Sequence, residues 1–124
     1  MATIKDFTDP VSVDELRWDD LVVGDGEEVL PHAEVTIHYT GALASDGTIF
    51  DSSQRTDDAQ PVTFPLDMLI EGWKKGIPGM KVGGKRRLYI PSNLGYGASG
   101  AGSIPANADL LFDIELFATK GGSK

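Results

Sequence analysis

Five aromatic side chains are the residues of this sequence whose type and placement could form a binding site. They fall on predicted strands, a predicted helix and a loop: Tyr39, Phe50, Trp73, Tyr96 and Phe112. Each lies where the apolar face of its element should point inward, so one interpretation is ordinary hydrophobic core. Buried tyrosines need hydrogen-bond partners for their hydroxyls, however, and a concave aromatic pocket with a few polar groups is the alternative. These residues alone leave both interpretations open.

Asp51 is the acidic residue with the strongest claim to a role in such a pocket. It follows the apolar pair Ile49 and Phe50 and precedes a polar loop over 52–61. A carboxylate in this position either caps the turn by accepting backbone hydrogen bonds or supplies a polar group to a site. Its position in the sequence favours neither role over the other.

Covalent and metal chemistry have few candidate residues here. The chain has no cysteine and only two histidines, His32 and His38, which argues against thiolate nucleophiles and multi-histidine metal centres. Two glycine-rich stretches, 79–85 and 95–100, resemble phosphate-binding loops. The first has Arg86 where a Ser or Thr must hold magnesium, and the second is not followed by the helix that its motif requires. We therefore expect no cofactor and no metal.

Charge and length narrow the class of protein. The 124 residues, which suit one domain, carry 19 acidic and 11 basic side chains. The resulting net charge of −8 disfavours binding to nucleic acid. No stretch reaches the roughly 20 apolar residues of a membrane span, and the first residues lack the pattern of a signal peptide. We expect a cytoplasmic protein with neither nucleic acid nor membrane as a partner.

The elements that must position these residues are mainly strands. Alternating patterns predict strands over about 35–40, 86–90 and 110–119, joined by turns that use many of the 15 glycines and 7 prolines. Apolar residues at helical spacing between Leu66 and Trp73 predict one short helix, with Gly76 as its C-terminal glycine. The expected fold is α+β, an antiparallel sheet with the helix on one face and a polar opposite face. Residues 1–16 show no clear period, so their order stays open.

Six short motifs, in order, resemble the motif set of the FKBP-type peptidyl-prolyl cis-trans isomerases. They are IHYTG at 37–41, GTIFDSS at 47–53, IEGWKKG at 70–76, GMKVGG at 79–84, LGYGA at 94–98 and IPANA at 104–108. The resemblance covers roughly 21–117. It implies a five- to six-stranded antiparallel β-sheet wrapped around one short α-helix, with an isomerase domain over 17–120 and a tail at 121–124.

The same resemblance implies an activity and a set of partners. A member of this immunophilin family would isomerise X-Pro bonds in peptides and unfolded proteins, assist their folding, and act as a monomer. It would also bind the macrolides tacrolimus and rapamycin. The runner-up from a different class is a non-enzymatic chaperone or binding module that holds proline-containing segments in the same pocket.

The family's site residues map onto positions of this sequence. The catalytic members would be Tyr39, Phe50, Asp51, Ile70, Trp73, Tyr96 and Phe112, with Trp73 as the floor of the pocket. The substrate-binding members would be Arg55, Val62, Leu69, Ala101, Ser103 and Ile104. In the family the backbone N–H at the Ile70 position and the hydroxyl at the Tyr96 position donate hydrogen bonds to bound carbonyls.

Three departures from the family pattern affect the pocket walls. Val62 stands where an aromatic residue is common, which should loosen one wall. The loop over 53–61 looks longer than usual, so Arg55 matches only approximately the arginine that often pairs with the aspartate. Residues 101–103 are small, so the loop over the pocket should grip a ligand less firmly.

Such a pocket needs no nucleophile, metal or general base, because rotation about an X-Pro amide breaks no covalent bond. Amide resonance creates a barrier of about 18–20 kcal/mol. Twisting the amide removes that resonance and lowers the negative charge on the carbonyl oxygen, so a dry apolar site favours the twisted state. Uncatalysed rotation takes tens of seconds, slow enough to limit folding.

Overall fold

The computed structural model describes residues 3–54 and 58–123. In these ranges the chain forms six strands, β1 (Arg17–Val22), β2 (Glu34–Leu43), β3 (Ile49–Ser52), β4 (Val62–Pro65), β5 (Lys85–Ile90) and β6 (Leu110–Lys120). The helical segments are one α-helix, α1 (Glu71–Gly76), and the 3-10 helices η1 (Leu66–Met68), η2 (Ser92–Leu94) and η3 (Gly97–Ser99).

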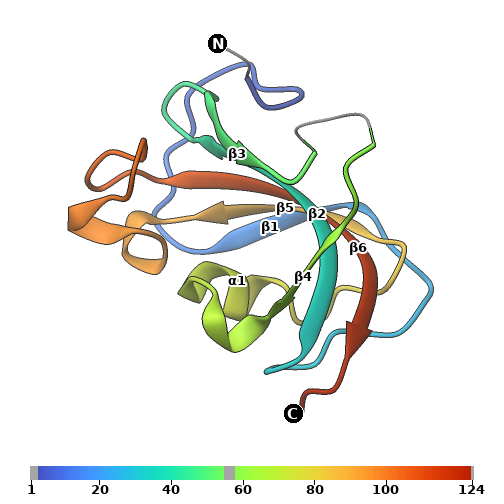
Figure 1. Cartoon of the computed structure of the whole chain (residues 1–124). Helices are drawn as coiled ribbons and strands as arrows, with labels where there is room; N and C mark the ends of the chain where they lie inside the picture. The colour runs from blue at the N-terminus through green and yellow to red at the C-terminus, as the bar shows by residue number, and fades with distance from the viewer. Residues whose placement is uncertain (1–2, 55–57, 124) are drawn as a thin grey trace.

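The strands make one curved antiparallel sheet in the order β1-β5-β6-β2-β3, and β4 pairs with β2 beside β3. The sheet wraps around α1 (Figure 1). The prediction of an α+β fold with a five- to six-stranded antiparallel sheet around one short helix is confirmed. Strands β3 and β4 follow each other along the same edge of β2.

The main core fills the space between α1 and the sheet. Strands β2, β5 and β6 turn alternate side chains toward the helix, as their sequence pattern predicts. These are Val35, Ile37, Leu88, Ile90, Leu110, Phe112, Ile114 and Leu116, all buried in one cluster with Trp73 and Ile77. The floor of the expected pocket is therefore continuous with the core.

Two glycines let α1 approach the sheet closely. A Cβ atom on Gly72 would lie 2.6 Å from Cγ2 of Ile90, and one on Gly76 would lie 2.9 Å from Cδ2 of Leu88. The sequence predicts Gly76 as a helix-ending glycine, but its φ is not positive and the following Ile77 keeps a right-handed helical backbone. Gly76 is required for packing rather than for a left-handed turn.

The single helix predicted over 66–76 is divided in two. Leu69 and Ile70 have extended backbones between η1 and α1. Because Ile70 is outside both helices, its N–H is not used in a helical hydrogen bond. Among the described residues, that N–H has no hydrogen-bond partner.

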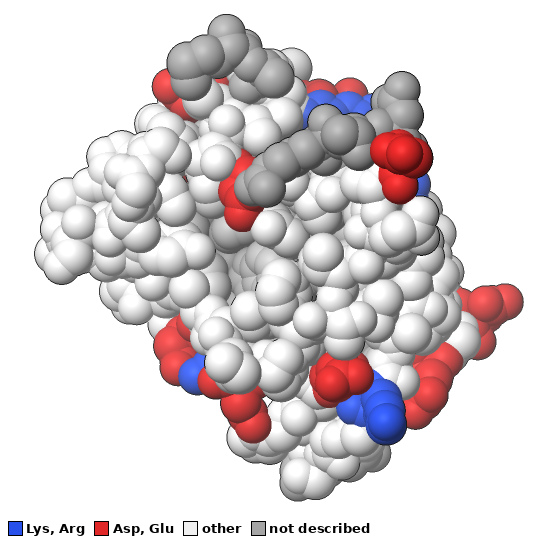
Figure 2. Space-filling view, viewed as in Figure 1, with Lys and Arg blue, Asp and Glu red and all other residues white. Residues whose placement is uncertain are grey.

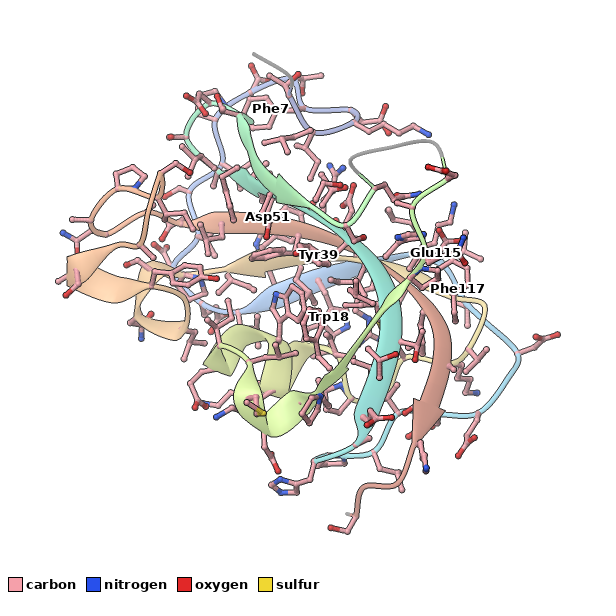
Figure 3. All side chains as sticks on the ribbon, in the orientation of Figure 1. Phe7, Trp18, Tyr39, Asp51, Glu115 and Phe117 are labelled. Atoms are coloured by element: carbon pink, nitrogen blue, oxygen red, sulfur yellow. The ribbon has the colours of Figure 1, made fainter. Side chains whose placement is uncertain are left out.

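The N-terminal segment, whose order the sequence leaves open, packs on the face of the sheet away from α1. Ile4 and Val13 are buried there in a second apolar cluster with residues of β2 and β6. Phe7 lies over the β2–β3 hairpin (Figure 3), against Gly47, which has a φ of +76° and no room for a Cβ atom. The expected polar face of the sheet is therefore apolar at this end.

Within the described residues, no helix is long and apolar enough to span a membrane.

Candidate active site

A cavity of about 290 Å³ opens between α1, η1 and the neighbouring strands. Its lining residues are Tyr39, Phe50, Asp51, Phe64, Met68, Leu69, Ile70, Trp73, Tyr96 and Phe112. Figure 2 shows a hollow near the middle of a face that carries few charged side chains. A larger concavity, of about 450 Å³, lies beside the N-terminal segment and is lined by charged as well as apolar groups. The smaller cavity is the candidate site because the aromatic cluster and Asp51 converge there.

Trp73 forms the floor of the aromatic cluster and is only 5% exposed. Its ring meets Tyr39 and Phe112 edge to face, with centroids 5.4 and 5.1 Å apart. Phe50 packs in the same way on Phe112 at 5.6 Å. Edge-to-face contacts of this kind fix ring orientation as well as burying area. The apolar surface of the pocket is therefore preorganised.

A glycine in β2 makes room for these rings. Gly41 pairs with Phe112 across β2 and β6. A Cβ atom at Gly41 would lie 2.5 Å from Cε1 of Phe112 and 2.8 Å from Cζ of Phe50. Any other residue at this position would displace one of the two rings.

Asp51 combines the two roles that the sequence leaves open. The hydroxyl of Tyr39 donates a hydrogen bond to Oδ2 of Asp51 at 2.8 Å. The backbone N–H of Ser52 donates to Oδ1 at 2.9 Å. Figure 3 shows Tyr39 and Asp51 side by side beneath β3. One carboxylate thus holds the turn at the end of β3 and orients a hydroxyl of the pocket wall.

Two hydrogen-bond donors border the cavity without a partner among the described residues. One is the Ile70 N–H at the start of α1. The other is the hydroxyl of Tyr96, whose residue is 37% exposed. Burial, and secondarily the negative charge of Asp51, raises the pKa of Tyr96, so its hydroxyl keeps its proton as a donor. Both groups suit the carbonyl oxygens of a bound chain.

Trp73 carries a third donor without a partner. Its indole Nε1–H is buried and has no hydrogen-bond partner among the described residues. A buried donor in this state costs about 1–3 kcal/mol. The surroundings of the indole in the deepest part of the site are therefore apolar.

The structure brings together all seven predicted catalytic residues, each of which lines the cavity, and adds Leu69 from the predicted substrate-binding set. The other described members of that set do not line it. Val62 is half-buried against the core, Ile104 is buried in it, and Ala101 and Ser103 are exposed in a turn. Arg55 lies outside the described residues.

Phe64 and Met68 line the cavity but are not among the predicted site residues. Phe64 lies two residues after Val62, on the same face of β4. Because Val62 replaces an aromatic residue that is common in the family, a nearby aromatic residue on the same strand face, Phe64, could have been predicted to line the pocket. Met68 lies within the segment of helical spacing but outside its apolar stripe, so nothing in the sequence indicates that it lines the cavity.

No group of three His, Cys, Asp or Glu side chains that could hold a metal ion occurs in the described ranges. The arrangement can enclose an apolar ring, exclude water from it and hold the carbonyl groups beside it.

Comparison with known proteins agrees with the family resemblance of the six motifs. A family model for FKBP-type peptidyl-prolyl cis-trans isomerase matches residues 26–117. The chain belongs to this family. An FK506-binding protein of Neisseria meningitidis is 52% identical over 101 residues, which cover 79% of this chain and 90% of that protein. The resemblance carried by the six motifs is confirmed, and this FKBP is an enzyme of the peptidyl-prolyl cis-trans isomerase class.

Two further relatives define the extent of the similarity. The FKBP-type isomerase FkpA of Aeromonas hydrophila is 56% identical over 84 residues, which cover 68% of this FKBP and 30% of that protein. The crystal structure of a peptidyl-prolyl isomerase from Pseudomonas syringae pv. tomato superposes with a TM-score of 0.77 at 39% identity. That match covers 86% of this FKBP and 76% of the solved chain. The chain thus spans less than a third of the Aeromonas relative but most of the other two.

Proposed function

We propose that this FKBP isomerises X-Pro bonds of peptides and unfolded proteins in the aromatic cavity and so assists their folding. The observation that carries the proposal is that an aromatic pocket is bordered by two donors without partners among the described residues, the Ile70 N–H and the Tyr96 hydroxyl. The pocket suits the proline ring, and the donors suit carbonyls on either side of it.

Rotation follows from desolvation rather than from proton transfer. The rings around Trp73 remove water from the X-Pro carbonyl oxygen, which carries most charge when the amide is planar. The twisted amide carries less charge there, so the same environment favours it over both planar isomers. Hydrogen bonds from Ile70 and Tyr96 hold the neighbouring backbone while the amide turns. Asp51 positions the Tyr39 hydroxyl and accepts no proton in this scheme.

Macrolide binding belongs to the same proposal. The name of the Neisseria relative describes it as a protein that binds FK506. We propose that tacrolimus and rapamycin occupy the cavity of this FKBP and compete with peptides. The small, exposed residues at 101–103 and the half-buried Val62 leave parts of the expected wall open, which should weaken the grip on a macrolide.

We further propose that this FKBP acts as a monomer in the cytoplasm. Its partners would be proline-containing chains, and neither nucleic acid nor a membrane would be among them. Analytical ultracentrifugation at micromolar protein concentration tests the oligomeric state and should show a monomer. A concentration-dependent dimer would contradict it.

The activity is tested by NMR exchange spectroscopy on a short Leu-Pro peptide. The protein should accelerate cis-trans interconversion, and saturating rapamycin should remove the acceleration. Peptide resonances that shift on binding while the exchange rate stays at its uncatalysed value would instead support the non-enzymatic binding module. Catalysis that persists at saturating rapamycin would move the reaction out of this cavity.

A further inference from the structure

Met68 is the most exposed large apolar side chain of the described residues, at 81%. It is the last residue of η1 and lines the mouth of the aromatic cavity. The other lining side chains are aromatic, branched aliphatic or the carboxylate of Asp51. Met68 is therefore the single unbranched, flexible apolar group in this wall, of a kind that adapts to differently shaped partners.

The second described methionine has the opposite environment. Met80 is 3% exposed and belongs to the main core cluster. A dissolved oxidant reaches the sulfur of Met68 directly, whereas the sulfur of Met80 becomes accessible only when the core opens. The chain thus contains its own buried control.

We propose that Met68 is a modification site at which peroxide oxidation lowers isomerase activity. The thioether sulfur attacks one oxygen of hydrogen peroxide and forms an S–O bond as the O–O bond breaks. Sulfur is oxidised by two electrons to the sulfoxide, and the departing hydroxide takes up a proton to give water. This inference rests on the proposed function of the cavity.

The consequence for the pocket follows from the mechanism. A sulfoxide is polar, accepts hydrogen bonds and retains water, whereas the thioether is apolar. Placed at the mouth of a cavity that works by excluding water, it hydrates the residue next to proline and removes apolar contact with it. Because Met68 is exposed, the change leaves the packing of the core intact.

The test compares wild type with Met68→Leu, each before and after dilute hydrogen peroxide. Mass spectrometry of peptide fragments locates the added oxygen, and NMR exchange on a Leu-Pro peptide gives turnover. Each protein's turnover is divided by its own value before treatment, so any basal effect of the substitution cancels. Oxidation of Met1 would lower the normalised turnover of both proteins equally, so the difference between the two proteins reports on Met68.

We expect Met68 to be oxidised while Met80 remains a thioether, wild-type kcat/KM to fall about fivefold, and the thermal midpoint to stay unchanged. Treated Met68→Leu should keep its own untreated turnover. Equal oxidation rates at Met68 and Met80, unchanged turnover at full Met68 oxidation, or an equal loss in Met68→Leu would each overturn the inference. Untreated protein without turnover contradicts the proposed function as well, so the two failures are distinguishable.

Discussion

At the residue scale, Asp51 shows how one side chain serves both structure and site. Its two oxygens accept hydrogen bonds from different groups, the Ser52 N–H and the Tyr39 hydroxyl. The negative charge also contributes to the raised pKa of Tyr96. Sequence position alone supports a turn cap and a site residue equally, because both roles use the same atom types at the end of a strand.

Asp51→Asn should lower peptide turnover about fivefold, because a neutral amide holds the Tyr39 hydroxyl less strongly than a carboxylate does. The fold should persist, with a thermal midpoint close to that of wild type, since the amide oxygen still accepts one hydrogen bond. Loss of the charge should also lower the pKa of Tyr96 toward its ordinary value. NMR exchange, thermal unfolding and an ultraviolet titration measure the three effects.

Asp46→Asn is the matched control, because Asp46 is an exposed turn aspartate that accepts the Thr48 N–H and does not line the cavity. It removes the same charge and should leave turnover unchanged. A collapse of stability in Asp51→Asn, with the remaining folded molecules fully active, would make Asp51 a structural cap only.

Turnover should be nearly constant between about pH 6 and 8. Histidine is the side chain whose reference pKa lies in this range. Neither histidine lines the cavity. The ring of His38 is buried with Nδ1 2.9 Å from Oγ of Ser53, and His32 is exposed beside Asp67. A titration limb in this range that His32→Gln or His38→Gln abolishes would show that proton transfer contributes.

The same profile should fall at alkaline pH. The pKa of Tyr96 is raised, so the folded state favours the protonated hydroxyl. The hydrogen bond that the Tyr96 hydroxyl donates to a bound peptide is fully available below the ordinary tyrosine pKa of about 10. It is lost as the pH rises through the higher pKa of the folded state. Peptide affinity should follow this loss in wild type but not in Tyr96→Phe, which lacks the hydroxyl throughout.

At the element scale, the close approach of α1 to β5 determines where the pocket floor lies. Alternation predicts β2, β5 and β6 correctly because each has one face in the core. The division between η1 and α1 is not predictable in this way. Leu69 and Ile70 keep helical spacing in the sequence although their backbones are extended. The spacing reports which side chains face the core, and the break depends on tertiary packing.

Gly72→Ala should destabilise the fold by about 2 kcal/mol, because the added methyl overlaps buried atoms of Ile90 that have no space to move. Chemical denaturation measures the loss. Lys75→Ala, at an exposed position of the same helix, should change stability by less than about 0.5 kcal/mol. Equal effects of the two substitutions would mean that α1 does not pack on β5 as described.

At the scale of the whole molecule, the aromatic site is continuous with the hydrophobic core. Trp73 and Phe112 belong to the main core cluster and also line the cavity. For this reason the residue types alone cannot separate core from pocket, whereas six motifs in the order typical of a family can. The packing of residues 4–13 on the far face could not be predicted from the residue pattern or from the motifs, since this segment has no period and lies outside those motifs.

The central claim is that turnover takes place on the floor formed by Trp73. Rapamycin titration of Trp18→Phe tests it most directly, because Trp73 is then the only tryptophan in the chain. Fluorescence of Trp73 and turnover of a Leu-Pro peptide should change together and reach their end points at one macrolide per chain. Turnover that disappears while Trp73 fluorescence stays constant, or that continues at saturating rapamycin, would contradict the claim.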